Sequence, residues 1–256
     1  MIDGYGFDKA FHDNFMKLLD FMANYYWRIE VEGIENIPED RGALLVMNHA
    51  GTIAIDVLMI KQIIYRKTPK NRIAWSLMAD FVTYTPFVGD IYWRTGNVLA
   101  CWENGFRLLN DDQLVIVCPE GTKGVGKHFI KRYQLVPFGK GGFARLAIQS
   151  DVPIIPISVV GSEEIFPVIY KNYPIGQLFG FPYFPVTLNL LFLGPLFFVP
   201  IPSKWRIQFG EPIYPSEYKN KGIDIDKIDQ IIAQDIENTI KRQLSEQLKK
   251  RHFIFF

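Results

Sequence analysis

Cysteine is scarce in this sequence, and neither sign of charge dominates it. Its two cysteines, Cys101 and Cys118, are too few for a disulfide scaffold or a cysteine-rich metal site and suit a reducing compartment. The 28 Lys and Arg nearly balance the 27 Asp and Glu, giving a net charge of +1, so the overall charge gives no reason to expect a nucleic-acid partner. No basic region followed by an apolar core comes after Met1, so we expect no cleavable signal peptide.

Apolar residues, by contrast, are plentiful. The 256 residues are 48% hydrophobic and 15% aromatic, which excludes a disordered protein and suffices for one α/β domain with a sizeable core. Strands are predicted at 28–32, 42–47, 72–76, 113–118 and 152–160, and helices at 56–66, 97–110 and 142–149. Strands that alternate with helices predict an α/β fold, here a single domain with a mostly parallel central sheet flanked by helices.

Amphipathic helices are predicted at both ends of the chain, so we divide it into an N-terminal helix (1–27), the α/β domain (28–215) and a C-terminal helix (216–256). In the first, apolar residues recur every three or four positions: Phe7, Phe11, Phe15, Leu18, Met22 and Tyr25. We expect this stripe to pack on the core, and its many aromatics leave contact with lipid as the alternative. The C-terminal helix, expected within 225–256, repeats an aliphatic residue every fourth position from Ile228 to Leu248.

Charge is absent from one long segment. Between Asn172 and Ser203, 32 residues include no Asp, Glu, Lys or Arg. That length suits a transmembrane helix, but the segment also includes six prolines, and its longest proline-free stretch, between Pro185 and Pro195, is too short to cross a bilayer. We therefore expect an irregular apolar segment that caps the core, dips into one leaflet of a membrane, or does both.

Two of the predicted strands end in residues that can carry chemistry. His49 follows strand 42–47, and Asp56 is near enough to accept its Nδ1 proton, which would leave Nε2 free to take a proton from an alcohol. Glu120, in the Pro119–Thr122 run, follows strand 113–118, and a carboxylate before Gly and Thr suits a polyol hydroxyl. The plainer interpretations are a turn histidine without a role and an ordinary loop.

Positive charge gathers between residues 121 and 150, where no acidic residue occurs. The six basic residues are Lys123, Lys127, Lys131, Arg132, Lys140 and Arg145. Such a run suits a phosphate-bearing ligand or an anionic membrane, unless acids elsewhere in the fold balance it. Arg94, beside Trp93, is a further candidate for clamping a phosphate.

In order and rough spacing these residues resemble the four motif blocks of the glycerolipid acyltransferases, whose best-known members are the lysophosphatidate acyltransferases. The blocks are Asn48-His49 with Asp56, Gly89 with Arg94, Pro119–Thr122 and residues 152–157. The resemblance covers about residues 37–213. The sequences of residues 117–124 and 138–147 are most similar to the branch related to monoacylglycerol and diacylglycerol acyltransferases.

One position departs from the family pattern. The family's first block usually places an aspartate five residues after the histidine, and this sequence has Ala54 there. We assign the role to Asp56, with Asp80 and Asp90 as the fallback acids.

The resemblance implies transfer of a fatty acyl group from acyl-CoA or acyl-carrier protein to a hydroxyl of a glycerolipid or lysophospholipid, without an acyl-enzyme and without a metal. His49 would be the general base and Asp56 would orient it. The implied acceptor-binding residues are Arg94, Glu120, Gly121 and Thr122, and the implied donor- or phosphate-binding residues are Lys123 and Lys127. The expected partners are the two substrates and a membrane surface, with the protein monotopic or peripheral on the cytoplasmic face.

Two alternatives stay open from the sequence. One is a lipid-binding protein without catalysis on the same fold. The other is a nucleotide hydrolase, because residues 121–127 read G-x-x-x-x-G-K after a strand, as a phosphate loop does. The next residue is His128, however, where such a loop needs Ser or Thr to bind Mg²⁺.

Overall fold

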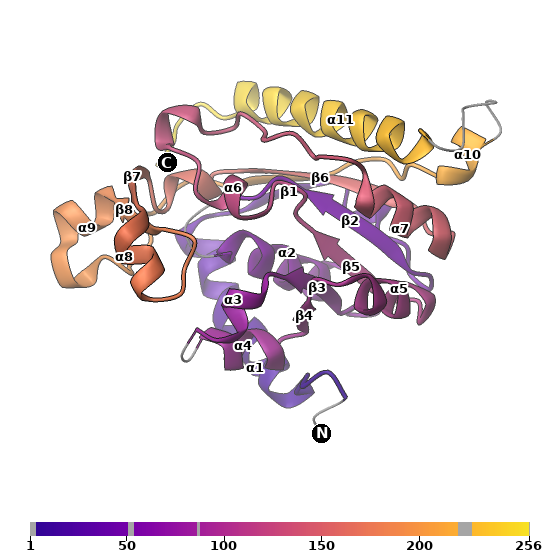
Figure 1. The fold of residues 1–256 in the computed structure, drawn as a ribbon, viewed down its shortest axis with the longest axis horizontal. Coiled ribbons are helices and arrows are strands. Elements are labelled where there is room, and N and C mark those ends of the chain that lie inside the picture. Colours follow the sequence, from indigo (N-terminus) through magenta and orange to yellow (C-terminus); the bar gives the residue numbers. More distant parts are fainter. Residues whose placement is uncertain (1–3, 51–53, 86–87, 220–226, 256) are drawn as a thin grey trace.

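A seven-stranded sheet runs through the molecule (Figure 1), in a computed structural model that describes residues 4–50, 54–85, 88–219 and 227–255. The strand order is β1-β9-β6-β2-β5-β3-β4. The strands are β1 (Glu30–Glu32), β2 (Ala43–Met47), β3 (Ala74–Met78), β4 (Asn97–Leu99), β5 (Leu114–Val117), β6 (Ile154–Val160) and β9 (Arg206–Phe209). From β6 to β4 all neighbours are parallel, and only the β6–β9 pair is antiparallel. The predicted α/β fold with a mostly parallel sheet is confirmed.

Helices cover both faces of this sheet, as the continuously apolar strands require. In β2, Leu45 and Met47 pack on the side of α1 and α2, whereas Leu44 and Val46 pack on the side of α5, α7 and α11. The α-helices are α1 (Lys9–Phe21), α2 (Ile55–Lys67), α3 (Asp80–Thr83), α4 (Val88–Arg94), α5 (Trp102–Asn110), α6 (Gly121–Val125), α7 (Gly142–Ser150), α8 (Tyr173–Leu178), α9 (Leu188–Leu193), α10 (Pro215–Lys219) and α11 (Ile228–Lys250). Short 3-10 turns are η2 (Ile34–Asn36), η3 (Phe129–Lys131), η4 (Ser162–Glu164) and η5 (Gly194–Leu196), and α1 continues into a π-helical turn, η1 (Met22–Tyr26).

The two terminal helices differ in how well their buried faces were predicted. Helix α11 buries its fourth-residue repeat from Ile228 to Leu244, as expected, while Ile225 lies outside the described residues. Helix α1 buries His12, Met16 and Leu19 instead of the predicted stripe. The buried face is therefore displaced by one residue, about 100° around the helix. As a result, Leu18 and Tyr25 of the predicted stripe face solvent, whereas Phe15 and Met22 pack at the edge of the core.

Two other expectations need correction. Residues 97–110 are not one helix, because residues 97–99 form strand β4 at the edge of the sheet beside β3 before α5 begins at Trp102. Pairing with a neighbouring strand outweighs the local helical pattern there. The charge-free segment is also more regular than expected. It begins at the end of β7 (Val168–Asn172) and includes α8, α9 and the strand β8 (Phe184–Thr187), which pairs antiparallel with β7.

The stretch from α8 to the residues after η5, 173–199, is called the α8–α9 extension below. With β7 it forms a small lobe at the left of Figure 1, beside the sheet. Among the described residues, no helix combines the length and the apolar character needed to cross a bilayer.

Candidate active site

Strand pairing brings His49 and Glu120 to one edge of the sheet. Strands β2 and β5 are parallel, with Val46 opposite Val117, so the residues that follow both strands leave the sheet side by side. The backbone N–H of His49 donates a hydrogen bond to Oε1 of Glu120 over 2.9 Å. The structure thus joins the two predicted strand-end residues directly.

Asp56 reaches the imidazole of His49 from the first turn of α2. Nδ1 of His49 lies 2.9 Å from Oδ2 of Asp56, and the Asp56 side chain is fully buried. The backbone N–H groups of Ala50 and Val57 also donate to this carboxylate, each over 2.8 Å. These donors and the positive end of the helix dipole stabilise negative charge at this position.

This arrangement determines which nitrogen of the neutral His49 ring carries the proton. An ionised carboxylate only accepts hydrogen bonds, so Nδ1 is the donor, and in the neutral ring the free lone pair is at Nε2. Burial opposes the charged imidazolium, but the charge and hydrogen bond of the Asp56 carboxylate outweigh it and raise the pKa of His49 well above its ordinary value. The His49 side chain keeps 11% of its surface exposed. The ring is therefore not completely closed off from the outside of the protein.

Glu120 has the contacts of a structural carboxylate. Its side chain is fully buried, and Oε2 accepts the N–H of Val136 over 2.7 Å and lies 3.1 Å from Nζ of Lys127. Helix α6 packs against it through Gly124, where a Cβ atom would stand 2.5 Å from that of Glu120 and 3.3 Å from the His49 carbonyl oxygen. Glu120 therefore ties together the chain segments after β2 and β5. Its predicted contact with an acceptor stays a prediction.

Lys127 also points inward. Its side chain is 7% exposed, and Nζ lies 3.1 Å from Oε1 of Glu163, which follows β6, as well as from Glu120. Burial raises the pKa of Glu163 to about 7, against the opposing charge of Lys127. The 121–127 run thus folds as helix α6 and a turn that ends in buried ion pairs, which is not the strand–loop–helix arrangement of a phosphate loop.

The other predicted site residues lie apart from this cluster or at its surface. Gly121 and Lys123 are exposed, and the carbonyl of Thr122 accepts a hydrogen bond from the Tyr183 hydroxyl over 3.2 Å. Arg94 faces the N-terminal helix, where it pairs with Asp8 at 2.9 Å and lies 3.9 Å from the ring centroid of Phe11. Acceptor binding by Arg94, Gly121 and Thr122, and donor or phosphate binding by Lys123 and Lys127, stay predictions.

Two positioning residues have roles that the sequence did not predict. Asn48 continues the pairing of β2 with β6, since its side-chain amide donates to the Val159 carbonyl over 3.0 Å and its Oδ1 accepts the Val159 N–H over 2.7 Å. It holds the backbone directly before His49. The position of Asn48 directly after a buried strand was the sequence feature that could have predicted this role. Glu163 left no such signal, because its partner Lys127 is far away along the chain.

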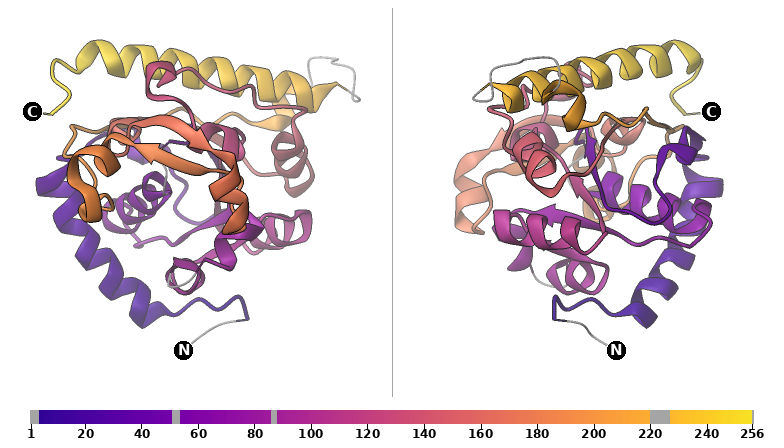
Figure 2. Two further views of the ribbon diagram at one scale, coloured as in Figure 1. Left: turned by 60° about the vertical axis from the view of Figure 1, so that its left-hand side comes forward. Right: turned by 90° about the vertical axis from the view of Figure 1, so that its right-hand side faces the viewer.

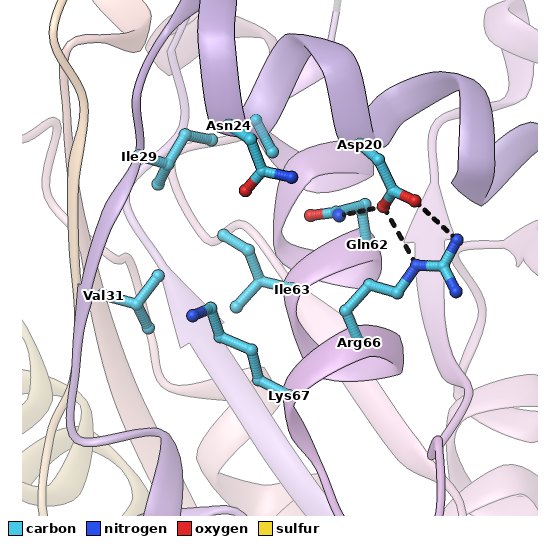
Figure 3. Close-up of a pocket in the computed structure, with 9 residues that line it drawn as sticks. Asp20, Asn24, Ile29, Val31, Gln62, Ile63, Arg66 and Lys67 are labelled. Atoms are coloured by element: carbon cyan, nitrogen blue, oxygen red, sulfur yellow. Dashed lines mark hydrogen bonds and ion pairs between the residues drawn. The ribbon is translucent and has the colours of Figure 1, made fainter.

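A cavity of about 420 Å³ lies elsewhere, between α1, β1 and the last turns of α2 (Figure 3). Asp20 there binds both Gln62 and Arg66, while Ile29 and Val31 form the opposite wall. Gln62 and Arg66 stand nearer the far end of α2 than Asp56 does, by about 9 and 15 Å along the helix axis. This cavity is therefore separate from the imidazole.

Comparisons with known proteins decide the family. A family model described as Acyltransferase matches residues 28–160, just over half of the chain. The chain belongs to this acyltransferase family. The resemblance to the lysophosphatidate-type acyltransferases that the motifs indicated is confirmed.

Individual relatives agree with this membership. Uncharacterized proteins of Mycobacterium tuberculosis and Mycobacterium leprae are 40% and 41% identical over 256 residues, covering 100% of this chain and 72% and 70% of theirs. Human 1-acyl-sn-glycerol-3-phosphate acyltransferase alpha is 28% identical over 169 residues, 63% of this chain and 56% of the human protein. The crystal structure of the 1-acyl-sn-glycerophosphate acyltransferase of Thermotoga maritima has the same fold, with a TM-score of 0.57 at 22% identity, over 94% of this chain and 78% of that one.

Proposed function

We propose that this acyltransferase moves a fatty acyl group from a thioester, acyl-CoA or acyl-carrier protein, to a hydroxyl of a glycerolipid or lysophospholipid. The observation that carries the proposal is the 2.9 Å contact between Nδ1 of His49 and the buried Asp56 carboxylate. That contact leaves Nε2 of a partly exposed imidazole as a base for an alcohol. The catalytic use of His49 and Asp56 is part of the proposal.

The reaction then needs one base and two bound substrates. Nε2 of His49 takes the hydroxyl proton as the alcohol oxygen attacks the thioester carbonyl. When the tetrahedral intermediate collapses, the carbon–sulfur bond breaks and the imidazolium returns the proton to the leaving thiolate. The products are an ester and a free thiol. Asp56 stabilises the imidazolium throughout, and such base catalysis supplies roughly 10²- to 10⁴-fold in rate.

A lipid acceptor must be taken from a membrane, and the α8–α9 extension has the surface for this. Its large apolar side chains are strongly exposed, with Leu178 at 79% and Phe192 at 80%. The others are Tyr173, Ile175, Phe179, Leu191, Leu193, Leu196, Phe198 and Val199. No Asp or Glu occurs from residue 165 to 210, so nothing acidic in this stretch repels an anionic lipid surface. A monomeric soluble protein rarely exposes so much contiguous apolar surface.

The segment after α1 and the C-terminal tail reach the same side of the molecule as the extension. The Tyr26 hydroxyl donates to the Pro200 carbonyl over 2.6 Å, Arg28 donates to the Phe255 carbonyl over 2.7 Å, and the Lys204 N–H donates to the Ile254 carbonyl over 2.8 Å. The end of α1, the extension and the C-terminal tail accordingly lie near one another in Figure 1 and in the left view of Figure 2. Exposed apolar residues of all three are Leu18, Phe21, Tyr25, Phe253, Ile254 and Phe255, besides those of the extension. We propose that this apolar side rests on one leaflet as a monotopic contact.

Labelled acyl-CoA offered with a panel of acceptors tests the activity. Lysophosphatidate, other lysophospholipids, monoacylglycerol and diacylglycerol are presented in vesicles, and products are identified by mass. We expect label in one acylated lipid and release of one free thiol for each ester formed. Free thiol without labelled lipid would show a thioesterase. The absence of both products, with acyl-CoA and with acyl-carrier protein as donor, would contradict the proposal.

Sedimentation with anionic vesicles tests the membrane contact. The proposed contact fails if the protein stays in the supernatant at low salt.

A further inference from the structure

A groove of about 540 Å³ lies between the segment that follows α6 and the strand β7 that leads into the α8–α9 extension. Lys123, Lys131 and His128 line it from one side, and Lys171 and Tyr170 line it from the other. Tyr173, from the first turn of α8, also contributes to the lining. The β7 wall lies beyond residue 160, outside the segment that the family model matches.

The charge in this groove is positive and largely unbalanced. Among the described residues, Lys123, Lys131 and Lys171 form no ion pair, and no acidic side chain lines the groove. Lys127 also lines the groove, but its charge is held in ion pairs with Glu120 and Glu163. Two further members of the basic run are paired elsewhere, Arg132 with Glu164 and Arg145 with Asp229, and Lys140 lies outside the groove. Lys171 lies over the ring of Tyr183, with Nζ 4.6 Å from the ring centroid, but no acid neutralises it. The three lysines thus offer positive charge to a ligand that carries several negative charges.

The lining also offers flat apolar surface next to these charges. Tyr170 is 61% exposed and Tyr173 is 54% exposed. Exposed aromatic rings stack on a planar base, and lysines bind phosphate as point charges. A nucleotide with several phosphates satisfies both features together, whereas a small lipid headgroup satisfies only the charges.

The groove is joined to the imidazole through α6. Gly124 packs against the His49 carbonyl, and Lys127, at the end of the same turn, contacts the carboxylate that binds the His49 N–H. On this basis we propose that the groove binds the phosphorylated adenosine end of a coenzyme A thioester. The thioester arm then extends past α6 to His49. This assignment deepens the proposed function and rests on it.

Equilibrium binding of free coenzyme A tests the groove without requiring turnover. The double variant Lys123→Ala/Lys171→Ala is compared with wild type, and Lys140→Ala is the matched control, because Lys140 is an exposed lysine of the same basic run outside the groove. We expect the dissociation constant for coenzyme A to rise by about tenfold or more in the double variant and to stay unchanged in the control. The melting temperature of each variant checks the fold.

Steady-state kinetics distinguish the two substrates that could place phosphate in the groove, the donor acyl-CoA and the acceptor lysophosphatidate. In the double variant, KM for acyl-CoA should rise, while KM for an acyl-pantetheine thioester without the nucleotide should not. A rise in KM for lysophosphatidate but not for acyl-CoA would assign the groove to the acceptor and overturn the proposal. Unchanged coenzyme A binding in the double variant would also overturn it. If no acyl transfer occurs at all, the proposed function fails, and the binding measurement still decides what the groove holds.

Discussion

Around His49 the side chains are polar and buried, whereas in the α8–α9 extension they are apolar and exposed. At the sheet edge, Asp56 and Glu120 have no exposed side-chain surface, and protein donors satisfy both carboxylates. In the extension, Leu178 and Phe192 expose about four-fifths of their surface. The His49 cluster, whose atoms must keep fixed distances, thus lies where strands and a helix hold the backbone. The apolar surface proposed to contact a membrane lies on short helices and strands beside the sheet.

The two regions should be separable by mutation, and His49→Ala should have the largest effect. Removing the base should lower turnover of acyl-CoA by roughly 10²- to 10⁴-fold, because the alcohol then attacks without losing its proton to the protein. Sedimentation with anionic vesicles should not change, since His49 lies outside the apolar side. Rates are measured with saturating acceptor by release of free thiol. Turnover that survives the substitution would exclude His49 as the base.

The converse variant is Phe179→Glu/Phe192→Glu. Burying one such side chain in an apolar phase is worth about 2 kcal/mol, so partitioning onto vesicles should fall by tenfold or more. Activity toward acceptor in vesicles should fall with it, while activity toward a soluble short-chain acceptor should be preserved. The matched control is Phe106→Glu on α5, at the opposite end of the molecule in Figure 1, where Phe106 is 36% exposed. Equal losses of vesicle binding and activity in the control would contradict a membrane contact specific to the extension.

Cys118→Ala should have the smallest effect, a change in turnover of less than about threefold. Cys118 lies close enough to His49 to influence its charge, but burial raises the pKa of the thiol and so disfavours the thiolate that a nucleophile would need. Direct transfer from thioester to alcohol uses no such group. Intact-protein mass after incubation with acyl-CoA alone should show no added acyl chain. A stable acyl adduct on Cys118 would replace direct transfer with a two-step route.

Sequence reasoning reached the imidazole and its acid because both depend on local order along the chain. A buried strand followed by His49, and a helix whose first turn carries Asp56, place the two groups together once the fold class is known. The lysines were harder to interpret. Lys127 belongs to a basic run in the sequence, but the strand order β6-β2-β5 brings Glu163 and Glu120 to it from two separate segments.

The same limit applies to the helix faces and the apolar segment. The periodicity of α1 predicts a helix, but which side is buried depends on packing against α2, and Leu18 ends up 66% exposed. For residues 172–203 the prolines correctly argue against a spanning helix. They do not indicate β8, whose pairing with β7 comes from hydrogen bonds across the hairpin. The contact of the C-terminal tail with Arg28 and Lys204 is likewise invisible to local patterns.

The central claim is that Asp56 holds His49 as the base, and the pH dependence of single-turnover acyl transfer to a soluble acceptor tests it most directly. A raised pKa means that the neutral base is lost as pH falls through that raised value. The wild-type rate should therefore fall about tenfold per pH unit on the acid side. In Asp56→Asn, this limb should move to lower pH and the plateau should be lower. Identical profiles for the two proteins, or a rate that does not fall with acid, would contradict the account.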